Sequence, residues 1–314
     1  MIVAITGGTG FIGKKLVARL VEQGDTVRVL TRRSSAVSGK SSLLEIHECD
    51  LVAAGINDLS AMLDGVDVLY HCAGQLTNTH MMNALHVDAT RKLTEAASRR
   101  VAHWVQLSSV GVYGQVAKGV ITEDSVLNPI GQYEVTKTES DKIVVNAAKN
   151  GGFSYSILRP SSVFGAGMAN QSLFSMIAMI DRGLFFYIGK PGASANYIHV
   201  DNVVEGLICC GTMQAAKGRI YNLSDHCTME HFVEVISDAL GRAAPWLRLP
   251  RPVAQLVGKT LGKIPGFPLT QSRVGALANR SIYPILRIQQ ELGYHHVVSM
   301  EDGLRELVKA YKTR

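Results

Sequence analysis

A tyrosine and a lysine stand four positions apart in the segment YEVTK, residues 133–137. If this segment is helical, Tyr133 and Lys137 lie one turn apart on the same face. A free tyrosine has a pKa of about 10 and is a poor base at neutral pH, whereas a neighbouring ammonium stabilises its phenolate. The pair can therefore exchange a proton with a carbonyl or an alcohol, although ordinary surface pairs have the same spacing.

A serine follows a predicted strand in the segment LSSVGVYG, residues 107–114. Ligands of open α/β sheets bind beyond the carboxyl ends of the strands. The hydroxyl of Ser109 is expected there to hydrogen-bond a developing alkoxide and to hold the substrate oxygen near Tyr133. The alternative is a serine that only caps a turn.

A glycine-rich turn, TGGTGFIG, occupies residues 6–13 directly after the first apolar segment. Glycines in such a turn allow a sharp bend, a close backbone approach to a pyrophosphate and close packing of helix on strand. The helix that follows offers free N–H groups and the positive end of its dipole. This context predicts a dinucleotide-binding turn rather than a plain strand-to-helix connection. The expected contacts are Gly7, Thr9, Gly10, Phe11, Ile12 and Gly13.

The second predicted strand ends in LTRRS, residues 30–34. An acidic residue at this point would hold the ribose 2′-OH of NAD, and an arginine would accept the 2′-phosphate of NADP. The chain has Arg32 and Arg33 and no carboxylate here. This favours NADP(H) over NAD(H), against the alternative of two solvated surface arginines.

Short β-branched runs alternate with helical patterns over the first half of the chain, and parallel strands need such crossover helices. Glycine and proline then recur and the pattern loosens. We predict an α/β fold: a Rossmann-type doubly wound parallel sheet in residues 1–160, and a smaller, irregular C-terminal substrate lobe in 161–314, some of whose segments return to the sheet. The predicted strands are 2–6, 26–31, 68–71, 104–108 and 154–158, and the predicted helices include 11–23, closed by Gly24, and 229–240, with Thr228 as N-cap.

Composition narrows the class of protein. Hydrophobic residues make up 46% and charged residues 18% of the 314, as in globular enzymes. The net charge of +6 is scattered and the aromatic residues are few, so nucleic acid is not expected as a partner. The five cysteines form no CxxC pair, which predicts a reducing cytoplasm and neither disulfides nor a zinc ribbon. His226, Cys227 and His231 fit a loop and a helix start, and no metal is expected.

Five of the nine prolines fall between Pro245 and Pro268, around an apolar and basic helix-like piece, residues 253–263. The piece could be a substrate lid, a membrane-surface helix or an ordinary surface element. Because one short basic helix gives weak membrane affinity, membrane contact is not expected. No segment approaches the length of a membrane span, and no secretory leader is expected.

Taken together, these stretches resemble the extended short-chain dehydrogenase/reductase family, which includes nucleotide-sugar epimerases, dehydratases, ketoreductases and 3β-hydroxysteroid dehydrogenases. The segments RPSSVFGAG (159–167), YIHVDNV (197–203) and ELGY (291–294) follow in the family's order, so the likeness covers nearly the whole chain. The resemblance implies a catalytic serine at Ser109, an acid/base at Tyr133, a nicotinamide-ribose ligand at Lys137 and a homodimer. It also implies cofactor contacts by Arg32, Asp50, Leu51, Cys72, Ala73, Gly74, Pro160 and Val163.

The substrate depends on departures from the family pattern. Many members carry an asparagine where this chain has His86. His86 could be a substitute polar group or an ordinary helix residue, and we favour the second interpretation. Ala195-Asn196-Tyr197 lacks the arginine that meets the pyrophosphate in sugar-nucleotide epimerases, and Phe267–Thr270 resembles steroid-type relatives. Three arginines of the second lobe could still meet a diphosphate: Arg248, Arg251 and Arg273.

These features favour hydride exchange with a nucleotide-linked sugar, by a 4-ketoreductase or an epimerase. A hydrophobic alcohol of the 3β-hydroxysteroid type is the alternative within the same enzyme class. A catalytically silent NADPH-binding sensor is the alternative outside it, and the presence of Ser109, Tyr133 and Lys137 argues against it.

Overall fold

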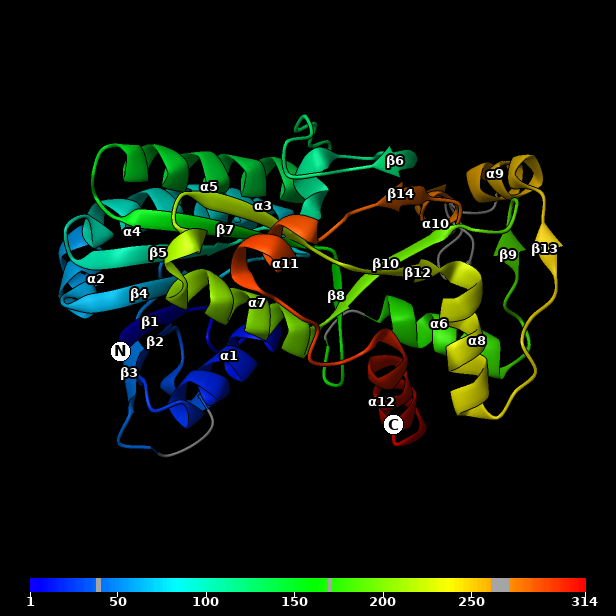
Figure 1. The fold of residues 1–314 in the computed structure, drawn as a ribbon, viewed down its shortest axis with the longest axis horizontal. Helices are drawn as coiled ribbons and strands as arrows, with labels where there is room; N and C mark the ends of the chain where they lie inside the picture. Colours follow the sequence, from blue (N-terminus) through cyan, green and yellow to red (C-terminus); the bar gives the residue numbers. More distant parts are fainter. Residues whose placement is uncertain (38–40, 169–170, 261–270) are drawn as a thin grey trace.

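The computed structural model describes residues 1–37, 41–168, 171–260 and 271–314. Its centre is a seven-stranded parallel sheet in the order β11-β7-β5-β4-β1-β2-β3 (Figure 1). The chain builds outward from β1 first toward β3 and then toward β11, so the order reverses beside β1, as in doubly wound sheets. The predicted fold class is confirmed. The strands are β1 (Ile2–Thr6), β2 (Thr26–Thr31), β3 (Leu44–Glu48), β4 (Val66–His71), β5 (Val101–Leu107), β7 (Ser154–Pro160) and β11 (Arg219–Leu223).

Two strands of this sheet were not predicted, and each has a physical reason. Central strands such as β1 are covered on both faces, so they are nearly continuous apolar runs. By contrast, β3 is an edge strand of sequence LEIHE that has no fully buried residue. The other omission, β11, comes after a long excursion through the second lobe before it pairs with β7.

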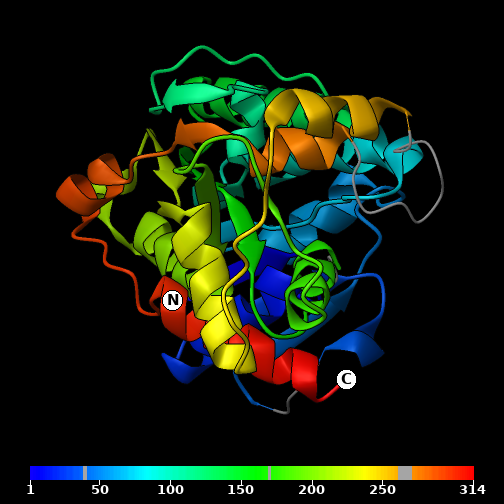
Figure 2. The ribbon, with the colours of Figure 1, turned by 90° about the vertical axis from the view of Figure 1, so that its right-hand side faces the viewer.

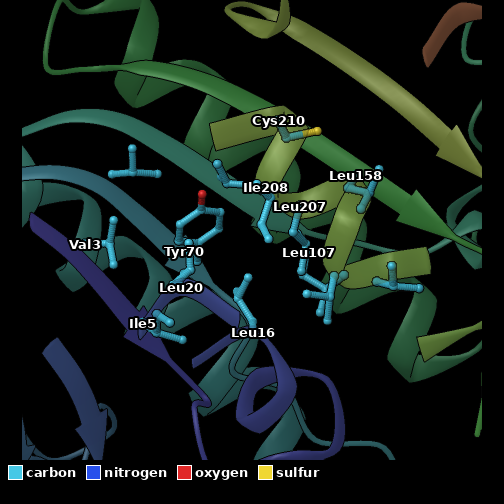
Figure 3. Close-up of a cluster of buried hydrophobic side chains, with 14 of the residues drawn as sticks. Val3, Ile5, Leu16, Leu20, Tyr70, Leu107, Leu158, Leu207, Ile208 and Cys210 are labelled. Carbon is cyan, nitrogen blue, oxygen red and sulfur yellow. The ribbon is translucent and has the colours of Figure 1, made fainter. Parts of the chain in front are cut away.

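Helices cover both faces of the sheet (Figure 1). On one face, Leu16 and Leu20 of α1 and Leu207 of α7 pack in one cluster with Tyr70 of β4 (Figure 3). On the other face, α2, α4 and α5 bury a second cluster around Trp104 of β5. The helices of this half are α1 (Phe11–Glu22), α2 (Ile56–Leu63), α3 (Thr79–Asn83), α4 (Ala89–Ala97), α5 (Gln132–Lys149), α7 (Val200–Thr212) and α11 (Leu286–Leu292), with short 3-10 or π turns η1 (Ser34–Ala36), η2 (Ala84–Asp88), η3 (Val110–Tyr113) and η4 (Gln214–Ala216).

A smaller lobe stands at the end of the large sheet (Figures 1 and 2). Its three-stranded sheet, β12-β10-β8, packs with α6, α8 and α12 around a separate apolar cluster that includes Phe164 and Phe232. A strand from the first half, β6, pairs with β14 and so joins the two parts. The elements are β6 (Lys118–Val120), β8 (Ser162–Phe164), β9 (Tyr187–Ile188), β10 (Ser194–His199), β12 (Asp225–Thr228), β13 (Arg248–Leu249), β14 (Arg280–Ile282), α6 (Ser172–Asp181), α8 (Met229–Leu240), α9 (Arg251–Thr260), α10 (Gln271–Leu277) and α12 (Met300–Lys312).

The two helices predicted with explicit ends are confirmed. Gly24 has a φ of +87°, which lets the chain leave α1. The Thr228 hydroxyl accepts a hydrogen bond from the His231 N–H at 3.2 Å and caps α8. The basic piece expected at 253–263 forms α9 as far as Thr260, and its last residues, like Phe267–Thr270, lie outside the described residues. None of the described helices is both long and apolar enough to span a bilayer.

Candidate active site

The glycine turn between β1 and α1 is packed so tightly that side chains do not fit. Gly7 has a φ of +72°, and its carbonyl accepts the Gly10 N–H at 2.9 Å. A Cβ on Gly13 would lie 2.1 Å from that carbonyl oxygen, and a Cβ on Gly7 would lie 2.7 Å from the Ala73 nitrogen. The turn therefore brings bare backbone against the loop that follows β4.

The first turn of α1 has the donors that an anion needs. Its N-cap is Gly10, so no side chain caps the helix, and no acidic residue stands in its first turn. Helix N–H groups and the positive end of the dipole consequently remain for an outside acceptor. Phe11 and Ile12 are partly buried, and Thr9 is exposed at the tip of the turn. A dinucleotide pyrophosphate fits this donor set.

The residues expected around the adenosine half follow β2 and β3. Arg32 and Arg33 are exposed, and neither guanidinium has a hydrogen bond or an ion pair within the described residues. Asp50 accepts the Val52 N–H at 3.0 Å, and Leu51 is buried beside it. The two guanidinium groups that follow β2 can therefore bind a phosphate.

The loop after β4 contains Cys72, Ala73 and Gly74. Ala73 is buried, and its N–H donates to the Thr6 hydroxyl at 3.3 Å. Burial raises the pKa of the Cys72 thiol to about 12, so this cysteine is not a thiolate at neutral pH. Pro160 ends β7 and is buried, and Val163 of β8 is partly buried. The ends of β1, β4, β5 and β7 thus meet at one edge of the sheet.

Ser109, Tyr133 and Lys137 come together at this edge. Ser109 caps η3, where its hydroxyl accepts the Gly111 N–H at 3.1 Å, and it hydrogen-bonds the Tyr133 phenol. Tyr133 stands in the first turn of α5 and Lys137 one turn later. The Lys137 ammonium is buried and donates to the Leu107 carbonyl. The predicted helical spacing is therefore present, and the serine lies within hydrogen-bonding reach of the phenol.

Electrostatics at the phenol differ from the expectation. Burial, followed by the Glu134 and Asp141 carboxylates, raises the pKa of Tyr133 to about 12, and the Ser109 hydrogen bond acts in the opposite direction. Burial lowers the pKa of Lys137. In this geometry the lysine charge is turned to a backbone carbonyl, so the prediction that it makes the phenol acidic is wrong here. Tyr133 is a protonated donor at neutral pH.

Sequence reasoning missed polar residues that lie behind this group. Asp141 follows Lys137 by one helical turn and forms a buried ion pair with Arg159. The signal was available, because Tyr133, Lys137 and Asp141 recur every four residues along one face of the helix. Of the two interpretations of His86, the structure favours a polar group with specific contacts over an ordinary helix residue, since its ring is buried and hydrogen-bonded at both nitrogens.

A cavity of about 320 Å³ opens beside the serine. Val110, the residue after Ser109, and Ser161, the residue after β7, line it together with residues of the smaller lobe, whereas Ser109 and Tyr133 do not line it. Its walls combine ten thioether, aromatic and aliphatic side chains with five serines, two asparagines and Arg273. The apolar lining consists of Val110, Met176, Met179, Phe185, Phe186, Tyr197, Met229, Ala276, Leu277 and Tyr283.

The second-lobe arginines are distributed unevenly around this cavity. Arg248 donates to Glu230 at 2.8 Å and lies over the Tyr187 ring, and it does not line the cavity. Arg273 does line it. Arg251 lies at a separate groove beside α9. Only one of the three expected arginines is therefore in place to meet a ligand in the cavity.

Metal-binding geometry is not found in the described part of the chain, which contains no group of three or more histidine, cysteine or acidic side chains around a common point. His231, one of the residues weighed for a metal, instead bonds Glu301 at 2.8 Å.

A comparison with protein families matches residues 3–224 to the NAD dependent epimerase/dehydratase family. The chain belongs to this family. One similar protein is the 3 beta-hydroxysteroid dehydrogenase/Delta 5→4-isomerase of Mycobacterium tuberculosis. It is 26% identical to the present chain over 339 aligned residues, which cover 98% of this chain and 90% of the relative. A 4-hydroxy-2-methyl-3-oxo-4-farnesyl-3,4-dihydroquinoline-1-oxide ketoreductase of Stigmatella aurantiaca is 26% identical, covering 98% of this chain and 95% of the relative.

Solved structures share the family fold. The UDP-glucuronic acid 4-epimerase from Bacillus cereus, in complex with UDP-glucuronic acid and NAD, superposes with a TM-score of 0.78 at 18% identity over 100% of this chain and 99% of that chain. The resemblance to extended short-chain dehydrogenases/reductases is confirmed, and so is the expectation of an NAD(P)-dependent oxidoreductase of that type.

Proposed function

We propose that this family member is an NADP(H)-dependent oxidoreductase that interconverts a ketone and a secondary alcohol on a largely apolar molecule. The observation that carries the proposal is the apolar cavity of about 320 Å³ that begins beside Ser109. Apolar walls with a few polar groups are typical of small-molecule sites. We assign the ketone to the end of this cavity that Val110 lines, next to Ser109 in the chain.

Different residues at the edge of the sheet would bind different parts of the cofactor. When bound, the nicotinamide dinucleotide supplies the hydride or accepts it. We assign the pyrophosphate to the glycine turn and the start of α1, the 2′-phosphate to the cations after β2, and the nicotinamide ribose to Lys137. The proposed contacts are Gly7, Thr9, Gly10, Phe11, Ile12, Gly13, Arg32, Arg33, Asp50, Leu51, Cys72, Ala73, Gly74, Tyr133, Lys137, Pro160 and Val163.

The proton is handled by Tyr133. Because its pKa is raised to about 12, the phenol is protonated at neutral pH and is ready to donate to a ketone oxygen. Ser109, hydrogen-bonded to the phenol, stabilises the developing alkoxide by a second hydrogen bond.

The apolar side chains of the cavity support an apolar ketone as the first candidate and the nucleotide-linked sugar that the sequence favoured as the second. A diphosphate needs several cationic donors, and Arg248 already pairs with Glu230. A nucleotide-linked sugar is the second candidate because Arg273 lies on the cavity wall. The expected homodimer and the expected cytoplasmic location stay predictions.

The test is NADPH consumption with a panel of ketones, with both steroid-like substrates and 4-keto nucleotide sugars in it. We expect turnover with an apolar ketone, and its loss in Tyr133→Phe while NADPH still binds. Turnover of Tyr133→Phe at the wild-type rate would rule out Tyr133 as the proton donor. Turnover with nucleotide sugars alone would contradict the apolar substrate and support the second candidate, a nucleotide-linked sugar.

A further inference from the structure

His86 lies beneath the edge of the sheet where the proposed cofactor and substrate residues meet. It belongs to η2, a π-helical turn between α3 and α4, and its side chain is 1% exposed. Such π-turns are rare and are often found at functional sites. The ring packs edge-on against Tyr133, with 5.7 Å between ring centroids and 81° between ring planes.

The hydrogen bonds of the ring determine its tautomer. The Gln75 backbone N–H, which can only donate, lies 2.8 Å from Nε2 of His86. Nε2 must therefore be the acceptor, and the ring proton of a neutral imidazole is on Nδ1. Nδ1 lies 2.8 Å from the Thr136 hydroxyl oxygen and donates to it. The Thr136 hydroxyl in turn donates to the carbonyl of Gln132 at 2.8 Å. Gln132 is the residue before Tyr133.

One side chain thus connects two backbones. On one side is the loop 72–75, which contains Cys72, Ala73 and Gly74. On the other side is the first turn of α5, which contains Tyr133. The ring itself also restricts the rotamer of the phenol through the edge-on contact.

We infer that His86 is a positioning residue, which holds the Tyr133 phenol at a set distance from the cofactor loop by accepting from Gln75 and donating to Thr136. The inference rests on the proposed function of Tyr133. A residue with one acceptor and one donor is required, and asparagine or glutamine can supply both from its amide. Only the imidazole adds a ring that packs on the phenol.

The contact is maintained across the working range of pH. Burial, and then the positive charge of Lys137, lowers the pKa of His86 to about 3. A charged imidazole would turn an N–H toward the Gln75 N–H, so the neutral tautomer is the one that fits this site. The pH profile of the activity should consequently show no rise or fall near neutral pH that is due to titration of His86.

The experiment compares three variants of the full chain. His86→Phe retains a ring against Tyr133 and removes both hydrogen bonds, whereas His86→Asn retains a donor and an acceptor. His103→Phe is the matched control, because His103 is also buried and bonds Ser154 and Ser156 with its two ring nitrogens, at 2.8 and 2.9 Å, away from the site. The measurements are kcat, KM, the NADPH dissociation constant and the thermal midpoint.

We expect His86→Phe to lower kcat by about 10- to 100-fold, because small displacements of a proton donor are costly, with NADPH affinity nearly unchanged. His86→Asn should recover most of that loss. His103→Phe should lower the thermal midpoint and leave kcat as it is. Equal losses of stability in both phenylalanine variants, with normal kcat in His86→Phe, would show a merely structural role and overturn the inference.

A second measurement does not depend on turnover or on folding of a variant. Long-range ¹H–¹⁵N NMR of the wild-type chain at pH 7 should show His86 neutral, with its proton on Nδ1. A proton on Nε2, or an imidazolium, contradicts the inference even if the enzyme is active. Absence of turnover with every ketone, together with the expected tautomer, would instead count against the proposed function.

Discussion

The Arg159 guanidinium lies 3.2 Å from a carboxylate oxygen of Asp141, and both side chains are about 96–97% buried. The same oxygen of Asp141 accepts the Ser108 hydroxyl at 2.8 Å. Arg159 also donates to the Tyr113 hydroxyl at 3.0 Å. The ion pair therefore ties α5, which carries Tyr133 and Lys137, to the carboxyl ends of β5 and β7.

Removing one partner of this ion pair should be costly. Arg159→Met leaves the Asp141 carboxylate buried without its counter-charge, and we expect a loss of about 3–5 kcal/mol in the free energy of unfolding. Urea unfolding at pH 7 measures it. Arg305→Ala is the control, because Arg305 pairs with Asp302 at the surface with 61% of its side chain exposed, and its loss should stay within about 0.5 kcal/mol. Similar losses in both variants would contradict the prediction.

Stability should fall as the solution is made mildly acidic. Burial lowers the pKa of His71 and His86 to about 3 and that of His103 to about 4. In the unfolded chain these groups take up protons near pH 6.5. Between about pH 6.5 and 4 the unfolded state therefore binds more protons than the folded state, and the free energy of unfolding falls as the pH is lowered.

Each of these histidines should remove about 1–2 kcal/mol between pH 7 and pH 5. Urea unfolding at the two pH values measures the total. His103→Gln, which removes one titrating group and retains hydrogen-bonding capacity, should show a smaller difference between pH 7 and pH 5 than the wild type. An unchanged free energy of unfolding at pH 5 would mean that the folded rings are protonated more easily than their burial indicates.

Cofactor choice should depend on the arginines after β2. Arg32→Ala removes a charge-assisted hydrogen bond to a 2′-phosphate, and we expect the NADPH dissociation constant to rise by about 10- to 100-fold with NADH affinity unchanged. Fluorescence titration of both cofactors measures it. Arg91→Ala, at an exposed arginine of α4 whose partner is Asp88, is the control and should change neither constant. Tighter binding of NADH than of NADPH by the wild type would refute the preference.

Filling the cavity should act on the substrate and leave the cofactor alone. Met176 lines the cavity, and Met176→Trp occupies part of its volume of about 320 Å³. We expect kcat/KM for a bulky apolar ketone to fall by at least about 10-fold, since crowding a packed pocket costs about 1–3 kcal/mol. Leu184→Trp is the control, because Leu184 is 61% exposed and outside the cavity. An unaffected kcat/KM in Met176→Trp would place the substrate elsewhere.

Several elements and site residues could be predicted from the sequence alone. Strands such as β1 and helices such as α1 were predictable because their signals are local: an apolar run, a glycine turn and a closing Gly24. The four-residue spacing placed Tyr133 and Lys137 on one face of α5 for the same reason. An exposed edge strand such as β3 has no comparable signal.

By itself, the order of residues determined the fold class, the glycine turn and the helical pair of Tyr133 and Lys137, because each depends on neighbours within a few positions. Only the tertiary structure decided that the Lys137 ammonium faces the Leu107 carbonyl, that His86 bridges a loop and α5, and that the cavity beside Ser109 is apolar. These properties depend on burial and on contacts between segments far apart in the chain, and no local pattern encodes either.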